Sequence, residues 1–493
     1  MSRKLSRLVL VSNRVPVGET TPGGLAVALK DALSTRQVLW FGWSGGLTDK
    51  TGAGLTSIRR GNVEYAVTDL TTDEYEGYYA GYANKALWPS FHYRLDLAEY
   101  QPDEFATYMA VNARFARELF ERISPSDQIW IHDYHLIPLA AELRKFGVTN
   151  PIGFFSHIPF PSPEIFRAIP QHAALASGLM ACDLVGFQSD RDRSNFERYA
   201  AEQAAMSALP ANAPQTGGSR MRAMAFPIGI DAVGFAKEAE TSAGCAPAAL
   251  VGAGKCLILG VDRMDYSKGL VERVTAIETL LDSRPDLCER VSYIQVTPPS
   301  RGEVDAYAQL RIELETCIGH VNGRFTTLDW APVRYLAQGL PRNELAGLYR
   351  DAAVGLVTPL RDGMNLVAKE FVAAQDPRNP GVLVLSEFAG VAEQLPEALI
   401  INPHDPAQQA RAIEHALAMP LPERQERHAA MMDTLNRYDA SWWCGAFLQE
   451  LAVATSRSSA VQAGAAHAHN EPLTAPQIAA GALAVAGCRL SGS

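Results

Sequence analysis

The sequence predicts an α/β fold built on parallel sheets. Short apolar runs alternate with helical patterns through most of the chain, and a polar or glycine-bearing loop follows each run. The runs are residues 7–13, 127–134, 151–160, 182–189, 255–263, 291–298, 353–360 and 381–388. Short strands that are apolar on both faces and are separated by helices indicate parallel sheets covered on both sides. Residues 138–146 and 365–375 carry the apolar spacing of amphipathic helices.

Length and composition predict a large globular protein with several domains. The chain has 493 residues, of which 47% are hydrophobic and 20% are charged. Domains usually have about 100–200 residues, so a single small module is excluded. The formal net charge is -10, which offers no basic field for nucleic acid or for an anionic membrane. If the ligand is anionic, its attraction has to be local.

The cysteines and the apolar segments predict a cytoplasmic protein. The seven cysteines are widely spaced and form no Cys-x-x-Cys motif, which fits neither a disulfide framework nor a zinc cluster. The apolar run at residues 8–11 is too short for a signal peptide. The segment 478–488 is too short to cross a bilayer, which needs about 20 apolar residues.

A change in composition predicts two domains of similar size. Residues 201–254 are rich in Ala, Pro and Gly, with one strand-like piece at 221–231. We predict an N-terminal Rossmann-like domain at 1–235 and a C-terminal one at 236–455. The last helix pattern, 441–454, is expected to pack back on the N-terminal domain. The Ala-rich tail, 456–493, contains no aromatic residue and is predicted to be disordered.

Ligands of open α/β sheets lie beyond the carboxyl ends of the strands, which directs attention to the polar residues there. Gly23 and Gly24 open a helix after the first run, and can admit a ligand to the backbone or form an ordinary turn. Asp133 follows another run between two histidines, but the local spacing supplies no third metal ligand. Its carboxylate can accept hydrogen bonds from sugar hydroxyls. For His157, in a proline-rich loop, a structural and a functional role both stay open.

Cationic residues after two later runs predict phosphate sites. Arg263 and Lys268 share the loop after residues 255–261 and can stabilise a leaving diphosphate, unless the loop is merely a solvated charged one. Arg301 follows the next run, and together with Arg14 it can hold a second phosphate.

The segment after residues 353–360 is the most informative. Residues 362–366 lead into a helix whose first backbone N–H groups suit phosphate oxygens. Glu370 lies one turn into that helix and can accept hydrogen bonds from both hydroxyls of a ribose. A loop with a purely structural role would not need both the Asp362-Gly363 pair and Glu370, so we favour a binding role for this segment.

Taken together, these segments resemble the trehalose-6-phosphate synthase family of retaining glucosyltransferases. The motifs are SNR, GG, LWFGWSG, LWPSFHYR, IHDYHL, SHIPFPSPEIF, DRMDYSKG, PSRGEV and PLRDGMNLVAKEFVAAQ, and the resemblance covers about residues 7–450. It implies the GT-B fold, in which the parallel sheets of two Rossmann-like domains face a central cleft. It also implies transfer of glucose from a nucleotide sugar, usually UDP-glucose, to glucose 6-phosphate, the first step of trehalose biosynthesis. It implies that the protein needs no metal and no cofactor, and we expect a homo-oligomer.

The resemblance also implies roles for individual residues. Positions that match the donor site are Gly24, His157, Arg263, Lys268, Asp362, Gly363, Met364, Asn365, Leu366, Val367 and Glu370. Positions that match the acceptor site are Arg14, Trp40, Tyr79, Trp88, Asp133 and Arg301. Arg263, Lys268, Asp133 and His157 are the predicted catalytic residues.

Alternatives remain for the mechanism and for the acceptor. Retention in this family is usually assigned to attack on the face of the leaving group, with a leaving-phosphate oxygen taking the acceptor proton. Asp133 as a covalent nucleophile is the other possibility, although we assign it to hydroxyl binding. A glucosylglycerol-phosphate synthase or a pseudo-sugar transferase can use the same scaffold. A catalytically silent sugar-phosphate sensor is the alternative from another class.

Overall fold

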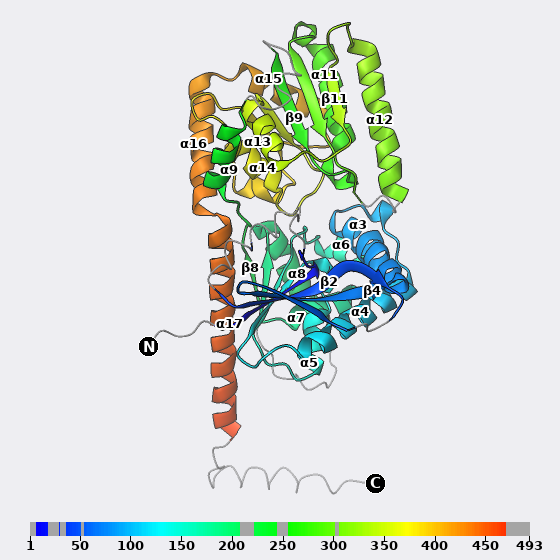
Figure 1. Ribbon diagram of the computed structural model, residues 1–493, viewed down its shortest axis with the longest axis vertical. Coiled ribbons are helices and arrows are strands. Elements are labelled where there is room, and N and C mark those ends of the chain that lie inside the picture. The colour runs from blue at the N-terminus through cyan, green and yellow to red at the C-terminus, as the bar shows by residue number, and fades with distance from the viewer. Residues whose placement is uncertain are drawn as a thin grey trace, which may run out of the picture.

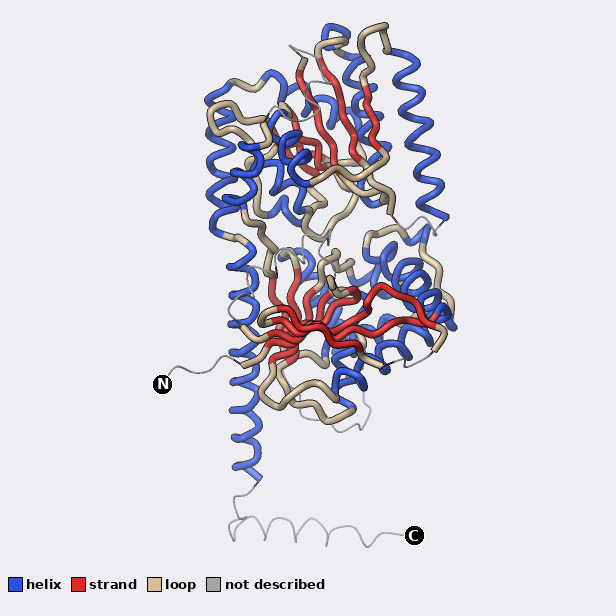
Figure 2. The backbone as a smooth tube through the Cα atoms, viewed as in Figure 1, coloured by secondary structure: helices blue, strands red, loops and turns tan. Residues whose placement is uncertain are grey.

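A computed structural model describes residues 6–17, 29, 36–50, 54–207, 221–243, 255–300 and 305–469, with side chains up to residue 454. These residues form two α/β units, which lie one above the other along the long axis of the molecule (Figure 1). Each unit contains one sheet with helices packed around it (Figure 2). The predicted α/β fold with two mostly parallel sheets is confirmed.

The first sheet has the strand order β3-β4-β2-β1-β5-β6-β7-β8 and is parallel except where β3 pairs with β4. Its central strands are buried along almost their whole length, because helices cover both faces. The strands are β1 (Leu8–Arg14), β2 (Val38–Thr48), β3 (Thr56–Arg60), β4 (Val63–Thr71), β5 (Gln128–His132), β6 (Ile152–Phe155), β7 (Leu184–Phe187) and β8 (Arg222–Ala225). Strands β2 to β4 are missing from the predicted runs because they are partly exposed and mix polar with apolar residues.

The helices of the first unit follow its strands along the chain. They are α2 (Thr72–Glu74), η1 (Tyr75–Leu87), α3 (Trp88–Phe91), η2 (Leu95–Leu97), α4 (Pro102–Phe120), η3 (Tyr134–Leu136), α5 (Leu139–Lys145), α6 (Pro163–Arg167), α7 (His172–Met180) and α8 (Asp190–Ser207). Helix η1 is a π-helix that packs along α4 and bears one of the predicted acceptor residues, Tyr79.

The second sheet has the strand order β11-β10-β9-β12-β13-β14, and its neighbouring strands run parallel. Its strands are β9 (Cys256–Val261), β10 (Val291–Val296), β11 (Val333–Leu336), β12 (Val354–Val357), β13 (Val382–Ser386) and β14 (Leu399–Ile401). The helices are α9 (Ala232–Thr241), η4 (Tyr266–Lys268), α11 (Leu270–Ser283), η5 (Pro285–Leu287), α12 (Asp305–Phe325), α13 (Arg342–Asp351), α14 (Leu366–Ala374), η6 (Gly390–Glu393), α15 (Pro406–Ala418), α16 (Leu421–Arg437) and α17 (Ala440–His469). Across the described ranges, no helix is both long and apolar enough to traverse a bilayer.

The second unit starts at α9, slightly before the position predicted from composition. Helix α9 packs on α13 and α14 of the second unit. Its Phe235 is buried, with its ring centroid 6.2 Å from that of Tyr349 on α13. The segment between β8 and α9 therefore joins the two units.

Helix α17 crosses back from the second unit and runs along the first (Figure 1). Phe447 stacks on Trp130 of β5 with ring centroids 4.4 Å apart, and Trp443 lies 4.9 Å from the same ring. The helix continues to His469, well beyond Thr455, so the predicted disorder from residue 456 is wrong for 456–469. Alanine has the highest helix propensity, and an Ala-rich segment can prolong a helix that is already formed. Residues 470–493 lie outside the described residues.

Close packing of α17 on β6 predicts that Gly153→Ala destabilises the protein. A Cβ atom at Gly153 would lie 2.6 Å from Phe447 Cε1, so the helix or the strand has to shift. We expect the free energy of unfolding to fall by about 1–3 kcal/mol, measured by urea unfolding. The matched control is Gly319→Ala in α12, where no atom lies within 4 Å of the new Cβ. That change should stabilise the protein by up to about 1 kcal/mol, and equal effects of both variants would contradict the packing argument.

Candidate functional site

A pocket of about 610 Å³ lies between the two units, at the carboxyl ends of strands from both sheets. The first unit contributes residues that follow β5, β6 and β7, and the second contributes residues that follow β9, β10 and β12 together with parts of α13 and α14. The lining residues are Asp133, His157, Gln188, Ile228, Val261, Asp262, Arg263, Lys268, Pro298, Leu345, Tyr349, Asp362, Met364, Asn365, Leu366, Val367 and Glu370. Most of the predicted donor-site residues therefore share one pocket.

Arg263 and Lys268 face the pocket in different electrostatic states. Lys268 Nζ lies 2.5 Å from Asp362 Oδ2, which also accepts a hydrogen bond from Asn365 Nδ2 at 3.0 Å. Burial alone lowers the pKa of Lys268, but the nearby carboxylates outweigh burial and raise it, so the ammonium stays charged. Arg263 is exposed to the pocket and forms no salt bridge within the described part of the chain. Among the described residues, Arg263 thus supplies a positive charge without a carboxylate at salt-bridge distance.

A buried ion pair holds the loop that carries these two cations. Arg273 of α11 is fully buried and donates to Asp262 Oδ2 at 2.7 Å and to the main-chain oxygen of Lys268 at 3.0 Å. It also donates to Thr358 Oγ1 at 2.9 Å, at the end of β12. One guanidinium therefore connects the loop after β9 to the neighbouring strand.

The start of α14 also lines the pocket, next to the Lys268–Asp362 pair. Asn365 has a positive φ of 80°, and its side-chain oxygen accepts a hydrogen bond from the backbone N–H of Ala368 at 3.3 Å. This cap leaves the first N–H groups of the helix directed to the pocket. Glu370 follows on the same helix, with Tyr349 Oη 3.5 Å from its Oε2. Burial raises the pKa of Glu370 to about 7.

The first unit presents Asp133 and His157 to the same pocket. Asp133 has a positive φ of 78°, and its Oδ1 accepts a hydrogen bond from the backbone N–H of His157 at 3.2 Å. Gly363 of the second unit packs on the carbonyl of His157, since a Cβ there would lie 2.3 Å from that oxygen. The predicted Asp-Gly sequence thus serves a close approach between the units at the pocket.

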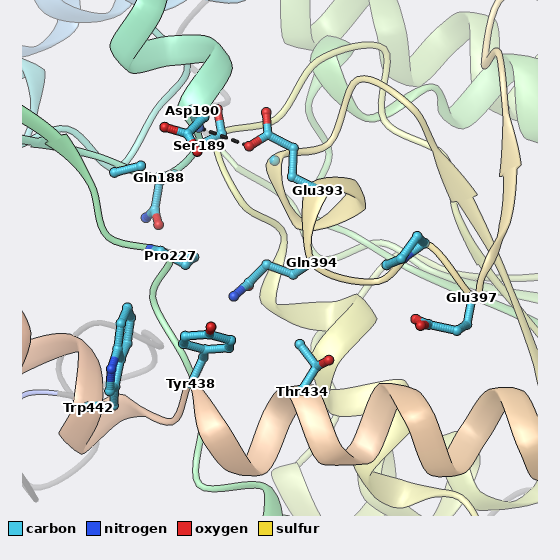
Figure 3. Close-up of a pocket in the computed structure, with 13 residues that line it drawn as sticks. Gln188, Ser189, Asp190, Pro227, Glu393, Gln394, Glu397, Thr434, Tyr438 and Trp442 are labelled. Atoms are coloured by element: carbon cyan, nitrogen blue, oxygen red, sulfur yellow. Dashed lines mark hydrogen bonds between the residues drawn. The ribbon is translucent and has the colours of Figure 1, made fainter.

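Further contacts join the two units beside the pocket. Arg361 donates to Tyr93 Oη at 3.2 Å, and its guanidinium lies 4.1 Å from the centroid of the Tyr93 ring. The carboxylate of Glu393 accepts hydrogen bonds from the backbone N–H groups of Asp190 and Arg191 at 2.9 and 3.2 Å. Figure 3 shows the first of these bonds at a second pocket, which shares Gln188 with the candidate site. These contacts hold the walls of the pocket together.

Three of the predicted acceptor residues lie along one series of rings that leads to Arg263. The Arg14 guanidinium is 5.8 Å from the Trp43 ring, and Trp43 is 5.5 Å from Tyr79. At the other end, the Arg263 guanidinium lies 5.9 Å from the Trp88 ring. The series runs through Arg14, Trp43, Tyr79, His135, Tyr134, Trp88 and Arg263. The structure thereby connects predicted acceptor residues with the pocket that holds most of the predicted donor residues.

Trp40 has a different environment from the other predicted acceptor residues. Like Trp88 it is buried, but it lies outside the series of rings: its Nε1 donates to Ser12 Oγ at 2.8 Å and its ring stacks on Tyr65. In this conformation its side chain is part of the sheet packing. Gly24 and Arg301 lie outside the described residues, so their predicted roles stay predictions.

Several residues of the site were missed by sequence reasoning. Gln188 follows β7, where the strand-end rule points, but an amide without charge gave no signal. Asp262 and Arg273 are buried, and their only signal is a pair of charges within otherwise apolar segments. Tyr349 lies on α13, and only the fold brings it to Glu370. The described residues contain no group of three or more His, Cys, Asp or Glu side chains arranged to hold a metal ion.

Comparisons with known proteins identify the family of this chain. The sequence profile of glycosyltransferase family 20 matches residues 9–453. A trehalose-6-phosphate synthase from Sinorhizobium fredii is 47% identical over 462 residues, which are 92% of this chain and 100% of that protein. A UDP-forming synthase structure from Burkholderia xenovorans in complex with glucose-6-phosphate is 43% identical with a TM-score of 0.84, covering 90% of this chain and 99% of that one. A trehalose-6-phosphate structure from E. coli bound with UDP-2-fluoro glucose is 44% identical with a TM-score of 0.84 and the same coverage. This chain belongs to glycosyltransferase family 20.

Proposed function

We propose that this enzyme transfers glucose from UDP-glucose to glucose 6-phosphate with retention of configuration. The products are α,α-trehalose 6-phosphate and UDP. The observation that carries this assignment is that Arg263, Lys268 and Glu370 line a single pocket between the two units. Two cations and a carboxylate in the same pocket suit a nucleoside diphosphate sugar. The relatives bound to glucose-6-phosphate and to UDP-2-fluoro glucose support the choice of both substrates.

The donor is held by groups with complementary chemistry. Glu370 accepts hydrogen bonds from the ribose hydroxyls when its carboxylate is ionised. The backbone N–H groups that start α14 face the diphosphate, as helix N-termini do with anions. Arg263 lies where negative charge develops as the diphosphate leaves, and a preorganised donor at such a position stabilises the transition state.

The protein supplies electrostatic stabilisation and orientation, and no covalent nucleophile. Asp133 is engaged through Oδ1 with the His157 backbone N–H, which holds its carboxylate as an acceptor for a sugar hydroxyl. The acceptor hydroxyl attacks the face that the diphosphate leaves, and a leaving-phosphate oxygen takes its proton. Arg14 binds the phosphate of the acceptor, together with Arg301.

A panel of donors and acceptors tests the function. Purified protein is incubated with UDP-glucose, GDP-glucose or ADP-glucose and with glucose 6-phosphate, glycerol 3-phosphate or free glucose. Released nucleotide and product are then identified by mass spectrometry and NMR. We expect UDP and α,α-trehalose 6-phosphate only when glucose 6-phosphate is present. Turnover with another acceptor but not with glucose 6-phosphate would reject glucose 6-phosphate as the acceptor. Binding of UDP-glucose and glucose 6-phosphate without turnover would identify a sensor.

The buried carboxyl of Glu370 predicts a pH-dependent KM for UDP-glucose. Because its pKa is about 7, the Glu370 carboxyl of the free enzyme is mostly protonated at pH 6 and mostly ionised at pH 8. Because the ribose hydroxyls require the ionised form, affinity rises with pH and is lost as pH falls through 7. We expect KM for UDP-glucose to increase about tenfold from pH 8 to pH 6, measured by initial rates. Glu370→Gln should bind more weakly and show a flat profile, and an unchanged slope in that variant would contradict the assignment.

We further propose that the enzyme works without metal or cofactor, as a homo-oligomer in the cytoplasm, in a pathway that makes trehalose for osmoprotection. The five cysteines within the described ranges are all free, which supports a reducing compartment. Full activity in excess EDTA and a mass above 53.4 kDa by light scattering are the expected results.

A further inference from the structure

The segment that joins the two units donates a backbone hydrogen bond toward the pocket. Ile228 lies between β8 and α9, and its N–H donates to Gln188 Oε1 at 3.0 Å. The carbonyl of the same residue accepts from Lys369 Nζ at 2.6 Å, and Lys369 also donates to Gln394 Oε1 at 2.6 Å. In Figure 3, Gln188 and Gln394 lie on either side of Pro227, which precedes Ile228. Both backbone polar groups of Ile228 are therefore held by side chains.

This backbone N–H determines which way the Gln188 amide faces. A peptide N–H can only donate, so the side-chain oxygen of Gln188 has to face Ile228. The Nε2 group then points to the other partner, His157 Nδ1, at 3.5 Å. Because an amide nitrogen donates and does not accept, His157 Nδ1 is the acceptor.

The same reasoning extends to the second histidine. With Nδ1 accepting, a neutral His157 carries its proton on Nε2, which lies 3.0 Å from His132 Nδ1. His132 Nδ1 is then the acceptor, and its proton is on Nε2. That Nε2 has no hydrogen-bond partner among the described residues, and the His132 ring lies 4.6 Å from Trp130 and 6.3 Å from Trp443 between ring centroids. An N–H suits the negative face of an aromatic ring better than a lone pair does.

These hydrogen bonds run from Ile228 through Gln188 and His157 to His132. The opposite donor–acceptor direction would place two donors against each other. If His132 donated to His157, then His157 Nδ1 would carry a proton that faces the Gln188 amide nitrogen. Turning the amide over would place its NH₂ group against the Ile228 N–H, which has no second tautomer. Burial lowers the pKa of His157 to about 3 and that of His132 well below its usual value, so both rings are neutral. Only the direction that starts at the Ile228 N–H avoids placing two donors against each other.

We propose that Gln188 is a positioning residue that fixes His157 in the donor pocket as the neutral tautomer with its proton on Nε2. It does so through hydrogen bonds that start at the Ile228 N–H of the segment between the units. Both ring nitrogens of His157 are then occupied by protein, so the ring exchanges no proton with substrate. The kinetic part of this inference rests on the proposed glucosyl transfer, whereas the tautomer does not.

Gln188→Glu is designed to reverse the donor–acceptor direction of these hydrogen bonds while keeping a side chain of nearly the same shape. A carboxylate accepts at both oxygens, so it keeps the bond from the Ile228 N–H and draws a proton onto His157 Nδ1. ¹⁵N NMR of the ligand-free full chain with labelled histidine, with His157 assigned by loss of its signals in His157→Gln, distinguishes the tautomers. We expect protonated Nε2 in the parent protein and protonated Nδ1 in Gln188→Glu. A parent His157 protonated on Nδ1, or a tautomer unchanged in the variant, would overturn the inference.

Kinetics of Gln188→Met test the positioning role separately. The variant cannot orient His157, and a misplaced group in a site can cost up to about 10²-fold in rate. We expect kcat/KM for UDP-glucose to fall by about tenfold or more, with KM for glucose 6-phosphate nearly unchanged. The matched control is Gln425→Met on α16, where the amide only donates to the carbonyl of Arg378 near the surface. Unchanged donor kinetics in Gln188→Met, or an equal loss for both substrates, would show that Gln188 has no positioning role.

Discussion

Replacing Arg263 with alanine is expected to lower kcat by about 10²–10³-fold, the usual cost of removing one preorganised donor from a site of developing negative charge. Lys268 cannot substitute for it, because Asp362 lies 2.5 Å from its ammonium and offsets much of its charge. The measurement is UDP release at saturating concentrations of both substrates. Arg263→Lys should retain more activity than the alanine variant, because it keeps a charge while losing the fork of donors.

The fold should survive this substitution. Arg263 is exposed to the pocket, and its described contact is with the ring of Trp88. Circular dichroism and urea unfolding should therefore match the parent protein. Arg411→Ala provides the control, because this side chain lies on α15 with 67% exposure. Near-normal turnover in Arg263→Ala would remove this residue from the leaving-group role.

Arg273→Met is expected to lower the free energy of unfolding by about 3–5 kcal/mol, because it leaves a buried carboxylate without its partner. Arg273 is 0% exposed and the Asp262 side chain is 3% exposed. Urea unfolding followed by tryptophan fluorescence reports on the second unit through Trp330, whose indole donates to the carbonyl of Val291. The loop that carries Lys268 also loses its anchor, so activity should fall even in native conditions.

A second substitution separates charge from packing. Asp262→Asn in the Arg273→Met background removes the unpaired charge and should recover part of the lost stability, as coupled neighbours do. Arg324→Met breaks surface ion pairs with Glu278 and Asp282 and should cost less than about 1 kcal/mol. A similar loss in Arg324→Met and Arg273→Met would contradict the role of burial.

Most of the central parallel strands of both units were predictable, whereas β2 to β4 of the first sheet and the edge strands β11 and β14 of the second were not. Strands such as β1 and β6 are buried along nearly their whole length, so their sequences are continuous apolar runs. Strand β3 is mostly exposed, and its sequence carries neither such a run nor a clean alternation. The extension of α17 to His469 was not predicted, because a segment without aromatic residues resembles a disordered one. Alanine nevertheless has the highest helix propensity, and this segment is rich in alanine.

The sequence by itself determined that this protein has two α/β units and that Arg263, Lys268, Asp362 and Glu370 follow strands at a ligand-binding edge. These features are local, since an apolar run and the polar residues after it are contiguous in the chain. Only the tertiary structure decided the electrostatic state of each group. Asp362 offsets Lys268 from 94 positions away, and Ile228 orients Gln188 across the joint between the units. Charge compensation, burial and hydrogen-bond direction depend on distances of a few ångströms between segments that are remote in sequence.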